Sequence, residues 1–147
     1  MNYQLIFNQK LIILTVILCI GCLAVIFFWC DNSYMDGSDY LKNHPVAKYC
    51  IRIMLTILLV SYFVVSELPM IKDKKVIDSE EYNIAYGVLE HEVCDGGMFG
   101  LSKSINMHFD EKEYEFSVAY IDENIKVGDY VKITYLPNSM YAVIEIK

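Results

Sequence analysis

The sequence predicts an α+β membrane protein, in which a transmembrane hairpin of two helices is followed by a small five-stranded β-barrel, OB-like or SH3-like. Three observations predict this fold class. Residues 11–29 and 50–66 are long apolar runs, and from residue 82 onward the hydrophobic period changes to two. The net charge of −7 falls entirely on the part after Pro69, which has eight lysines and fifteen acidic residues. Such a step in composition separates a membrane part from a soluble part.

The first predicted span is Leu11–Trp29, which contains no charged residue and a single hydroxyl. At about 1.5 Å per residue, a helix of this length nearly crosses a hydrocarbon core of about 30 Å. Phe27, Phe28 and Trp29 are typical of an aromatic belt at the membrane interface. A cleaved signal peptide fits less well, because the run is too long and no small-residue cleavage site follows it.

The second predicted span is Cys50–Ser66, with Arg52 near its start. We expect the Arg52 guanidinium to reach the headgroups, and Pro69 to end the helix. Neither span contains Asp, Glu, His or Lys, the groups on which ion and proton paths depend. This argues against a transporter built from these two helices alone.

Two spans place both chain ends on one side of the membrane. Basic residues flank the ends at Lys10, Lys72, Lys74 and Lys75, and flank the connecting loop at Lys42, Lys48 and Arg52. By the positive-inside rule we expect a multi-pass membrane protein with both termini and the barrel in the cytoplasm. The predicted organisation is residues 1–69 for the helices and outer loop, 70–81 for a charged linker or short helical stub, and 82–147 for the barrel.

Two of the five cysteines lie at the outer ends of the predicted spans. In an antiparallel hairpin Cys30 and Cys50 lie at the same depth, which predicts a disulfide between them on the oxidising side. Two unrelated thiols are the alternative. Cys94, in the soluble part, is expected to be reduced.

The soluble part alternates with the period of a strand. Ile84, Tyr86 and Val88 fall on one face of the first strand, within residues 82–93, and its central glycine indicates a bend. The glycine-rich segment 94–104 is expected to be a loop, and Gly128 to adopt positive φ in a turn. Four further strands are predicted at residues 105–109, 113–121, 130–136 and 140–147.

The last strands carry a resemblance to a known family. Gly128-Asp129 before a strand, and Tyr135-Leu136-Pro137-Asn138-Ser139 after it, resemble the small barrels of bacterial NfeD-like membrane proteins. In these proteins a few transmembrane helices precede an OB-like barrel, and the resemblance covers about residues 82–147. It implies a scaffold or regulatory module, and it transfers no catalytic residue.

The strongest cluster of reactive side chains is Glu90, His91, Glu92 and Cys94, with His108 and Asp110 further along the chain. A zinc site needs four converging ligands, but His91 and Cys94 are three residues apart and fall on opposite faces of a regular strand. We therefore predict no catalytic, cofactor or metal site. A metal-binding or thiol-dependent sensor or enzyme that uses Cys94, His91 and His108 is the alternative.

The acidic charge of the soluble part disfavours nucleic acid as a partner. Twelve tyrosines are present, and their rigid apolar faces with polar tips suit protein surfaces. We expect a non-enzymatic module that presents the barrel to a protein partner or to further copies of itself, through Tyr86, Tyr120, Tyr130 and Tyr141. An accessory or immunity role beside a toxin or secretion system is a narrower form of this hypothesis. An oligomeric channel or transporter subunit is a further alternative.

Overall fold

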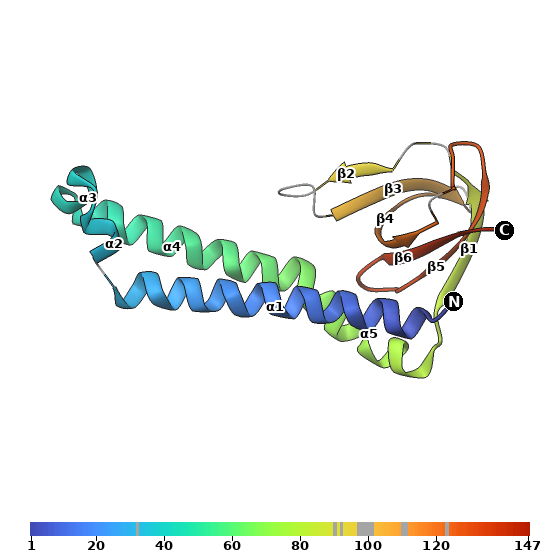
Figure 1. Ribbon diagram of the computed structural model, residues 1–147, viewed down its shortest axis with the longest axis horizontal. Helices are drawn as coiled ribbons and strands as arrows, with labels where there is room; N and C mark the ends of the chain where they lie inside the picture. Colours follow the sequence, from blue (N-terminus) through green and yellow to red (C-terminus); the bar gives the residue numbers. More distant parts are fainter. Residues whose placement is uncertain (32, 90, 92, 97–101, 110–111, 123) are drawn as a thin grey trace. The chain divides into compact units, whose positions relative to one another are not determined.

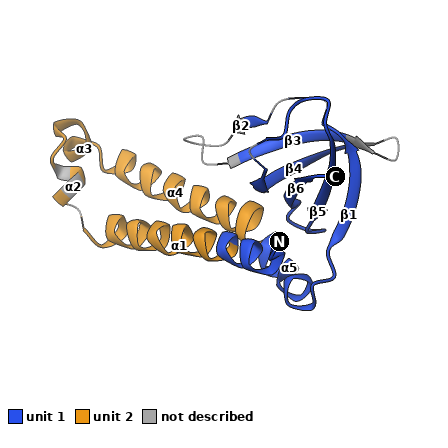
Figure 2. Cartoon of the chain, turned by 45° about the vertical axis from the view of Figure 1, so that its right-hand side comes forward, with its two compact units in different colours: residues 1–10, 69–147 blue, residues 11–68 orange. Residues whose placement is uncertain are grey.

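The computed structural model describes residues 1–31, 33–89, 91, 93–96, 102–109, 112–122 and 124–147. The chain forms two compact units (Figure 2). The helix-pair unit is Leu11–Leu68, and the sheet unit is Met1–Lys10 together with Pro69–Lys147. Helix α1, Tyr3–Cys30, belongs to both units, because its residues up to Lys10 pack with the sheet.

The helix-pair unit contains two long helices that lie antiparallel and side by side (Figure 1). Two short helices, α2 (Ser33–Asp36) and α3 (Asp39–Asn43), connect α1 to α4 (Pro45–Tyr62). Among the described residues, the helical segments Tyr3–Cys30 and Pro45–Ser79 are long and apolar enough to cross a membrane. Only 6% of the most apolar window of each segment is buried inside the chain, so their apolar side chains face outward.

The two helices approach closely at Gly21. A Cβ atom at this position would lie 2.7 Å from Cδ1 of Leu59 on α4, closer than two carbon atoms pack. Polar contacts hold the pair on both sides of this point. The Tyr62 hydroxyl donates to the Leu14 carbonyl at 3.2 Å, and Trp29 Nε1 donates to Thr56 Oγ1 at 3.2 Å.

The prediction that Pro69 ends the second helix is wrong. After α4 the chain continues as the π-helix η1 (Phe63–Glu67) and then as α5 (Leu68–Ser79). Proline lacks an N–H, and its ring clashes with the carbonyl four residues earlier in an α-helix. Here the amide of Leu68 donates to the Phe63 carbonyl, five residues back, which widens the turn just before the proline. The helix therefore accommodates Pro69 in a π-turn, and most of the segment 70–81 is helix α5.

The sheet unit is built on one curled, mixed sheet. Within the described part of the chain it has six strands in the order β1-β5-β6-β4-β3-β2, and all neighbours are antiparallel except the parallel pair β4–β6. Strands β1 and β3 are also in contact although three strands separate them in this order, so the sheet curls into a half-barrel. The strands are β1 (Asn83–Val88), β2 (Cys94–Gly96), β3 (Ser102–Phe109), β4 (Lys112–Ile121), β5 (Tyr130–Tyr135) and β6 (Tyr141–Ile146).

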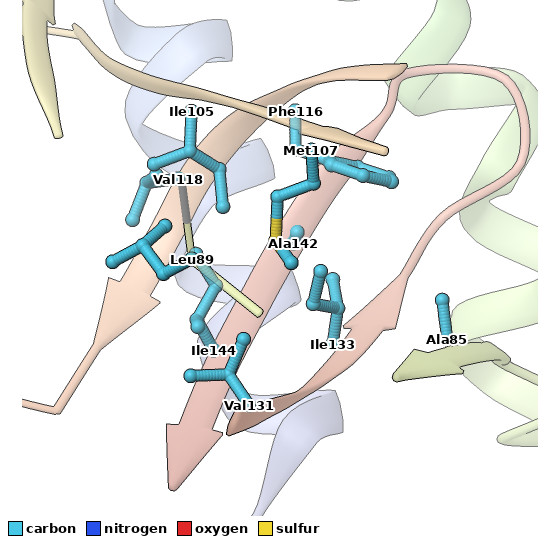
Figure 3. Packing of buried hydrophobic residues seen from close by; sticks show 10 residues of the cluster. All are labelled: Ala85, Leu89, Ile105, Met107, Phe116, Val118, Val131, Ile133, Ala142 and Ile144. Atoms are coloured by element: carbon cyan, nitrogen blue, oxygen red, sulfur yellow. The ribbon is translucent and has the colours of Figure 1, made fainter. Parts of the chain in front are cut away.

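The inner face of the curl holds the hydrophobic core (Figure 3). Val131 and Ile133 of β5 are fully buried there, as their alternation with Lys132 predicts. On β1, Ala85 faces this core while its neighbours Ile84 and Tyr86 are exposed. The cluster comprises Ala85, Leu89, Ile105, Met107, Phe116, Val118, Val131, Ile133, Ala142 and Ile144.

The five predicted strands are confirmed as β1, β3, β4, β5 and β6, and Gly128 has the expected positive φ, at 97°. The expectation of a loop over residues 94–104 needs correction. Cys94–Gly96 forms the short strand β2, which pairs with Ser102–Ser104 at the start of β3. Glycine weakens a strand without preventing backbone pairing, and a neighbouring strand supplies the partner groups here. Residues 97–101 lie outside the described residues.

Candidate functional site

A carboxyl group lies inside the helix pair, where the sequence predicts no acidic residue. Glu67 is the last residue of η1, and it is only 2% exposed. Its Oε1 atom lies 2.6 Å from Oγ1 of Thr15, near the middle of α1. Thr15 is the single hydroxyl residue of the predicted first span, and it contacts the acidic residue that directly follows the second.

The acceptors of this pair outnumber the hydrogens available to them. The Thr15 hydroxyl carries one hydrogen, yet it lies 2.9 Å from the Leu11 carbonyl as well as 2.6 Å from Glu67 Oε1. Glu67 Oε2 is buried and has no hydrogen-bond partner among the residues that the structure describes. Ionisable groups inside membrane segments are costly, and they mark ion sites and polar contacts between helices. Glu67 is therefore the strongest candidate for chemistry within the helix pair.

The predicted span Cys50–Ser66 ends with its apolar run, one residue before Glu67, so the sequence places this carboxyl group outside the helix pair. In the structure Glu67 ends the π-helix η1 and its carboxyl group contacts Thr15 of α1. The signal that was present is an acidic residue placed directly after an apolar run.

Arg52 lies toward the other end of the helix pair, beside Phe28 and Trp29 of the predicted aromatic belt, and its contact with headgroups stays a prediction. It is 6% exposed, and its Nε atom donates to the Phe28 carbonyl at 2.8 Å. The guanidinium also lies over the rings of Trp29 and Tyr49, with centroid distances of 5.7 and 5.8 Å. The last carbonyls of a helix lack intrahelical donors and carry partial negative charge, so α1 attracts this cation to its C-terminal end.

The start of α1 is bound to the outer face of the sheet, opposite the core. The Tyr3 hydroxyl donates to Glu145 Oε2 at 2.5 Å, and Lys132 Nζ donates to the Tyr3 oxygen at 2.9 Å. The hydrogen bond to Tyr3 raises the pKa of Lys132, and Glu145, 3.6 Å away, adds to this effect against the opposing influence of burial. Burial raises the pKa of Tyr82, whose ring packs against Phe7 and Tyr3. These contacts cover one part of the outer face.

Helix α5 is bound to the turn between β5 and β6 through Asp73. This carboxylate is fully buried and accepts from the backbone amides of Asn138 and Ser139 and from Asn138 Nδ2. The shortest of these contacts are 2.7 Å. The Pro137-Asn138-Ser139 turn, quoted above for the family resemblance, therefore forms a binding site for a carboxylate of the same chain.

All four tyrosines predicted as a partner surface lie on the outer face. Lys132 alternates along β5 with the core residues Val131 and Ile133, so it points to the outer face. In the strand register Tyr86 of β1 and Glu145 of β6 both pair with Lys132 and share this face. The same register assigns Tyr120 and Tyr141, through Val143 and Ser117, to this face. The exposed fractions are 45% for Tyr86, 39% for Tyr120 and 48% for Tyr130.

Two of these tyrosines share one cation. Tyr86 and Tyr130, on the adjacent strands β1 and β5, share one cation: Lys147 Nζ lies 4.7 Å from the Tyr86 ring centroid and 5.2 Å from that of Tyr130. Tyr141 instead lies under Lys10, at 5.2 Å, and the Tyr120 hydroxyl contacts Asp122 at 3.3 Å.

The residues of the alternative metal or thiol site are only partly described. His91 and Cys94 are exposed, while the side chain of His108 and residues Glu90, Glu92 and Asp110 lie outside the described part. Among the described residues there is no group of three His, Cys, Asp or Glu side chains that could hold a metal ion. Cys30 and Cys50 are both exposed thiols, so their disulfide stays a prediction.

The chain matches no protein-family model, no curated protein and no solved structure. The resemblance to NfeD-like proteins therefore stays a prediction, and the function must be inferred from the residues of the chain itself.

Proposed function

We propose that the protein is a membrane-anchored, non-enzymatic interaction module that presents the outer face of its acidic sheet unit to a protein partner. The observation that carries the proposal is the contrast between two surfaces. The helix pair exposes large apolar side chains such as Leu23, at 67%, and Val65, at 73%, which water does not solvate well. The sheet unit has its own core and an outer face with exposed tyrosines.

Anchoring gives such a module a physical advantage. A domain held at the bilayer meets a membrane-borne partner at a high effective concentration, so modest affinity suffices. We assign the sheet unit to the cytoplasmic side of the bacterial membrane on the lysine distribution. An accessory or immunity role beside a toxin or secretion system is the narrower form of the proposal.

We further propose that the half-barrel is of the OB type. With the short strand β2 set aside, the order is β1-β5-β6-β4-β3, and the only parallel pair in the described sheet, β4–β6, joins the third and fifth of these strands. This is the order of a partly open five-stranded Greek-key barrel. OB barrels bind their ligands on a strand face and adjoining loops, and here the acidic charge favours a protein ligand over nucleic acid.

Photo-crosslinking in native membranes tests the main proposal. A photoreactive amino acid at position 130 or 86 should capture a defined protein, whereas the same residue at the buried position 133 should capture none. Alkaline carbonate should leave the chain in the membrane pellet. Extraction by carbonate would refute the anchor, and equal capture from positions 133 and 130 would refute the outer face as the interaction surface.

Glu67 favours a second candidate function, an oligomeric channel or transporter subunit. A buried carboxyl oxygen without a described partner, beside Thr15, is the kind of group that carries a cation or proton between helices. The chain reconstituted in liposomes should then show proton or alkali-cation flux. Glu67→Gln should abolish that flux, while replacement of the exposed Val65 by Ala should retain it. No flux from the unaltered chain would exclude this candidate.

A further inference from the structure

The outer face of the sheet unit contains a cation held between two aromatic rings. Lys147 Nζ lies within 5.2 Å of both ring centroids, those of Tyr86 and Tyr130. The register places these tyrosines diagonally on β1 and β5, because Tyr86 pairs with Lys132 and Tyr130 pairs with Val88. Diagonal neighbours in a sheet are within reach of aromatic side chains. The two rings thus form one site that takes one ammonium group.

This site is open to exchange with an external ligand. Both tyrosine rings are about half exposed, and Lys147 itself is exposed, so no buried structure holds the lysine in place. Aromatic faces attract ammonium groups through the ring quadrupole, and this attraction is weak at exposed sites. Lys147 is therefore an occupant that a competing ammonium can displace.

We propose that Tyr86 and Tyr130 form a recognition site for a lysine side chain of the protein partner, and that Lys147 fills this site until the partner displaces it. The inference rests on the proposed function and names the chemistry of the partner segment, a basic peptide. Ile84 and Val88, exposed on the same strand face as Tyr86, provide apolar surface for the methylene groups of the incoming lysine.

The charge of the sheet unit favours the same kind of partner. From Met70 onward the chain has fifteen acidic residues and eight lysines, so its field attracts a basic segment and repels an acidic one. Near the site, the Lys132 cation is engaged by Tyr3 and Glu145. Lys147 is the ammonium that lies over the tyrosine pair, and its displacement leaves the two ring faces open to a partner cation.

The first measurement uses the full chain in maltoside detergent with ring-labelled tyrosine, and follows Tyr86 and Tyr130 by NMR as choline is added. Binding should shift both ring signals, and the isosteric neutral alcohol, in which carbon replaces the nitrogen, should not. Lys147→Met removes the internal competitor and should tighten choline binding by about fivefold. Equal binding of the neutral alcohol, or unchanged affinity in Lys147→Met, would overturn the proposal.

Variants of the tyrosines localise the site. Tyr86→Leu or Tyr130→Leu should abolish the choline-induced shift of the remaining ring, whereas Tyr120→Leu, at an exposed tyrosine of the same face, should leave it unchanged. Tyr130→Phe keeps an aromatic face and should retain binding. Retained binding in Tyr86→Leu, or loss of binding in Tyr120→Leu, would place the site elsewhere.

A peptide arm tests the class of ligand. A lysine-rich peptide should displace choline from the site, and the same peptide with glutamine in place of lysine should not. Displacement by a short-chain phosphatidylcholine but not by the lysine peptide would assign the site to lipid headgroups and overturn the protein partner. If crosslinking captures a partner while choline and the peptide fail to bind, this inference fails and the proposed function stands. If choline binds but crosslinking captures no partner, the cation site stands and the proposed function fails.

Discussion

At the scale of single residues, Asp73 binds three N–H groups of one turn, those of Asn138 N, Asn138 Nδ2 and Ser139 N. Asp73→Ala removes the acceptor and leaves these donors without their protein partner at a buried position. We expect the sheet unit to lose about 2–3 kcal/mol of stability. Amide hydrogen exchange at Asn138 and Ser139 in the full chain measures the effect.

The matched control for Asp73 is Asp78→Ala on the same helix. Asp78 is exposed and pairs with Lys74 at 2.7 Å, a surface contact worth at most about 1 kcal/mol. Equal acceleration of exchange in both variants would mean that Asp73 acts only through the helicity of α5, and not through the turn.

Lys132 gives the sheet unit a pH dependence whose direction is fixed. Its pKa is raised in the folded chain by the hydrogen bond to Tyr3. A cation with a raised pKa stabilises the fold fully below its unfolded pKa of about 10.4, and this contribution is lost as the pH rises through the folded value. Unfolding of the unaltered chain and of Lys132→Met should therefore differ at pH 8 to 9 and converge above the raised pKa. A difference that grows above pH 10.5 would contradict the assigned direction.

At the scale of elements, Gly21 sets the distance between α1 and α4. Gly21→Leu places a branched side chain where a Cβ alone meets Leu59 Cδ1 at 2.7 Å, and such overpacking costs about 1–3 kcal/mol. Thermal unfolding in detergent, followed by the single tryptophan, Trp29, should report a lower midpoint. Leu59→Ala should rescue the variant, and Ala24→Leu, at an exposed position of α1, should leave the midpoint unchanged. If the double variant Gly21→Leu, Leu59→Ala unfolds at the same lowered midpoint as Gly21→Leu alone, the contact with Leu59 does not set the distance between the helices.

The element scale also separates what the sequence predicts well from what it does not. Strand alternation predicts the inner face correctly at Val131 and Ile133, because the period of two is a property of the backbone itself. The composition of a segment cannot report a partner strand, so β2 was expected as loop although Ser102–Ser104 supplies its backbone pairs. The π-turn before Pro69 depends on how the whole helix is held, and the propensity of proline alone predicts the opposite.

The same distinction applies to the candidate site. Tyrosine content and alternation predicted Tyr86 and Tyr130 as surface residues, and both are exposed on the outer face. Their common cation, Lys147, comes from the end of β6, and only the fold of three strands brings it to them. Glu67 and Thr15 are fifty-two positions apart, and their meeting follows from the pairing of two helices rather than from any local pattern.

At the scale of the whole molecule, the start of α1 and helix α5 are both bound to the same sheet. Tyr3, at the start of α1, binds Glu145, and Asp73, on α5, binds the turn after β5. The sheet unit therefore holds both chain segments that lead into the two apolar helices. If these helices cross the membrane, the sheet unit and the start of α1 must lie on the same side, because two spans return the chain to its starting side.

Thiol labelling decides which side that is. Cys30, Cys50 and Cys94 are all exposed in the structure, so each reacts wherever the reagent reaches it. With the cytoplasmic orientation, a membrane-impermeant maleimide applied to intact cells should label single-cysteine chains at position 30 or 50, after mild reduction if the two are oxidised. A chain with Cys94 alone should react only after the membrane is opened. Replacement of Cys19 and Cys22 within α1 by alanine provides the background. The reverse pattern, Cys94 labelled in intact cells and the other two silent, would place the sheet unit outside. The basic partner segment would then belong to an extracellular protein, and the lysine distribution around the spans would have misassigned the orientation.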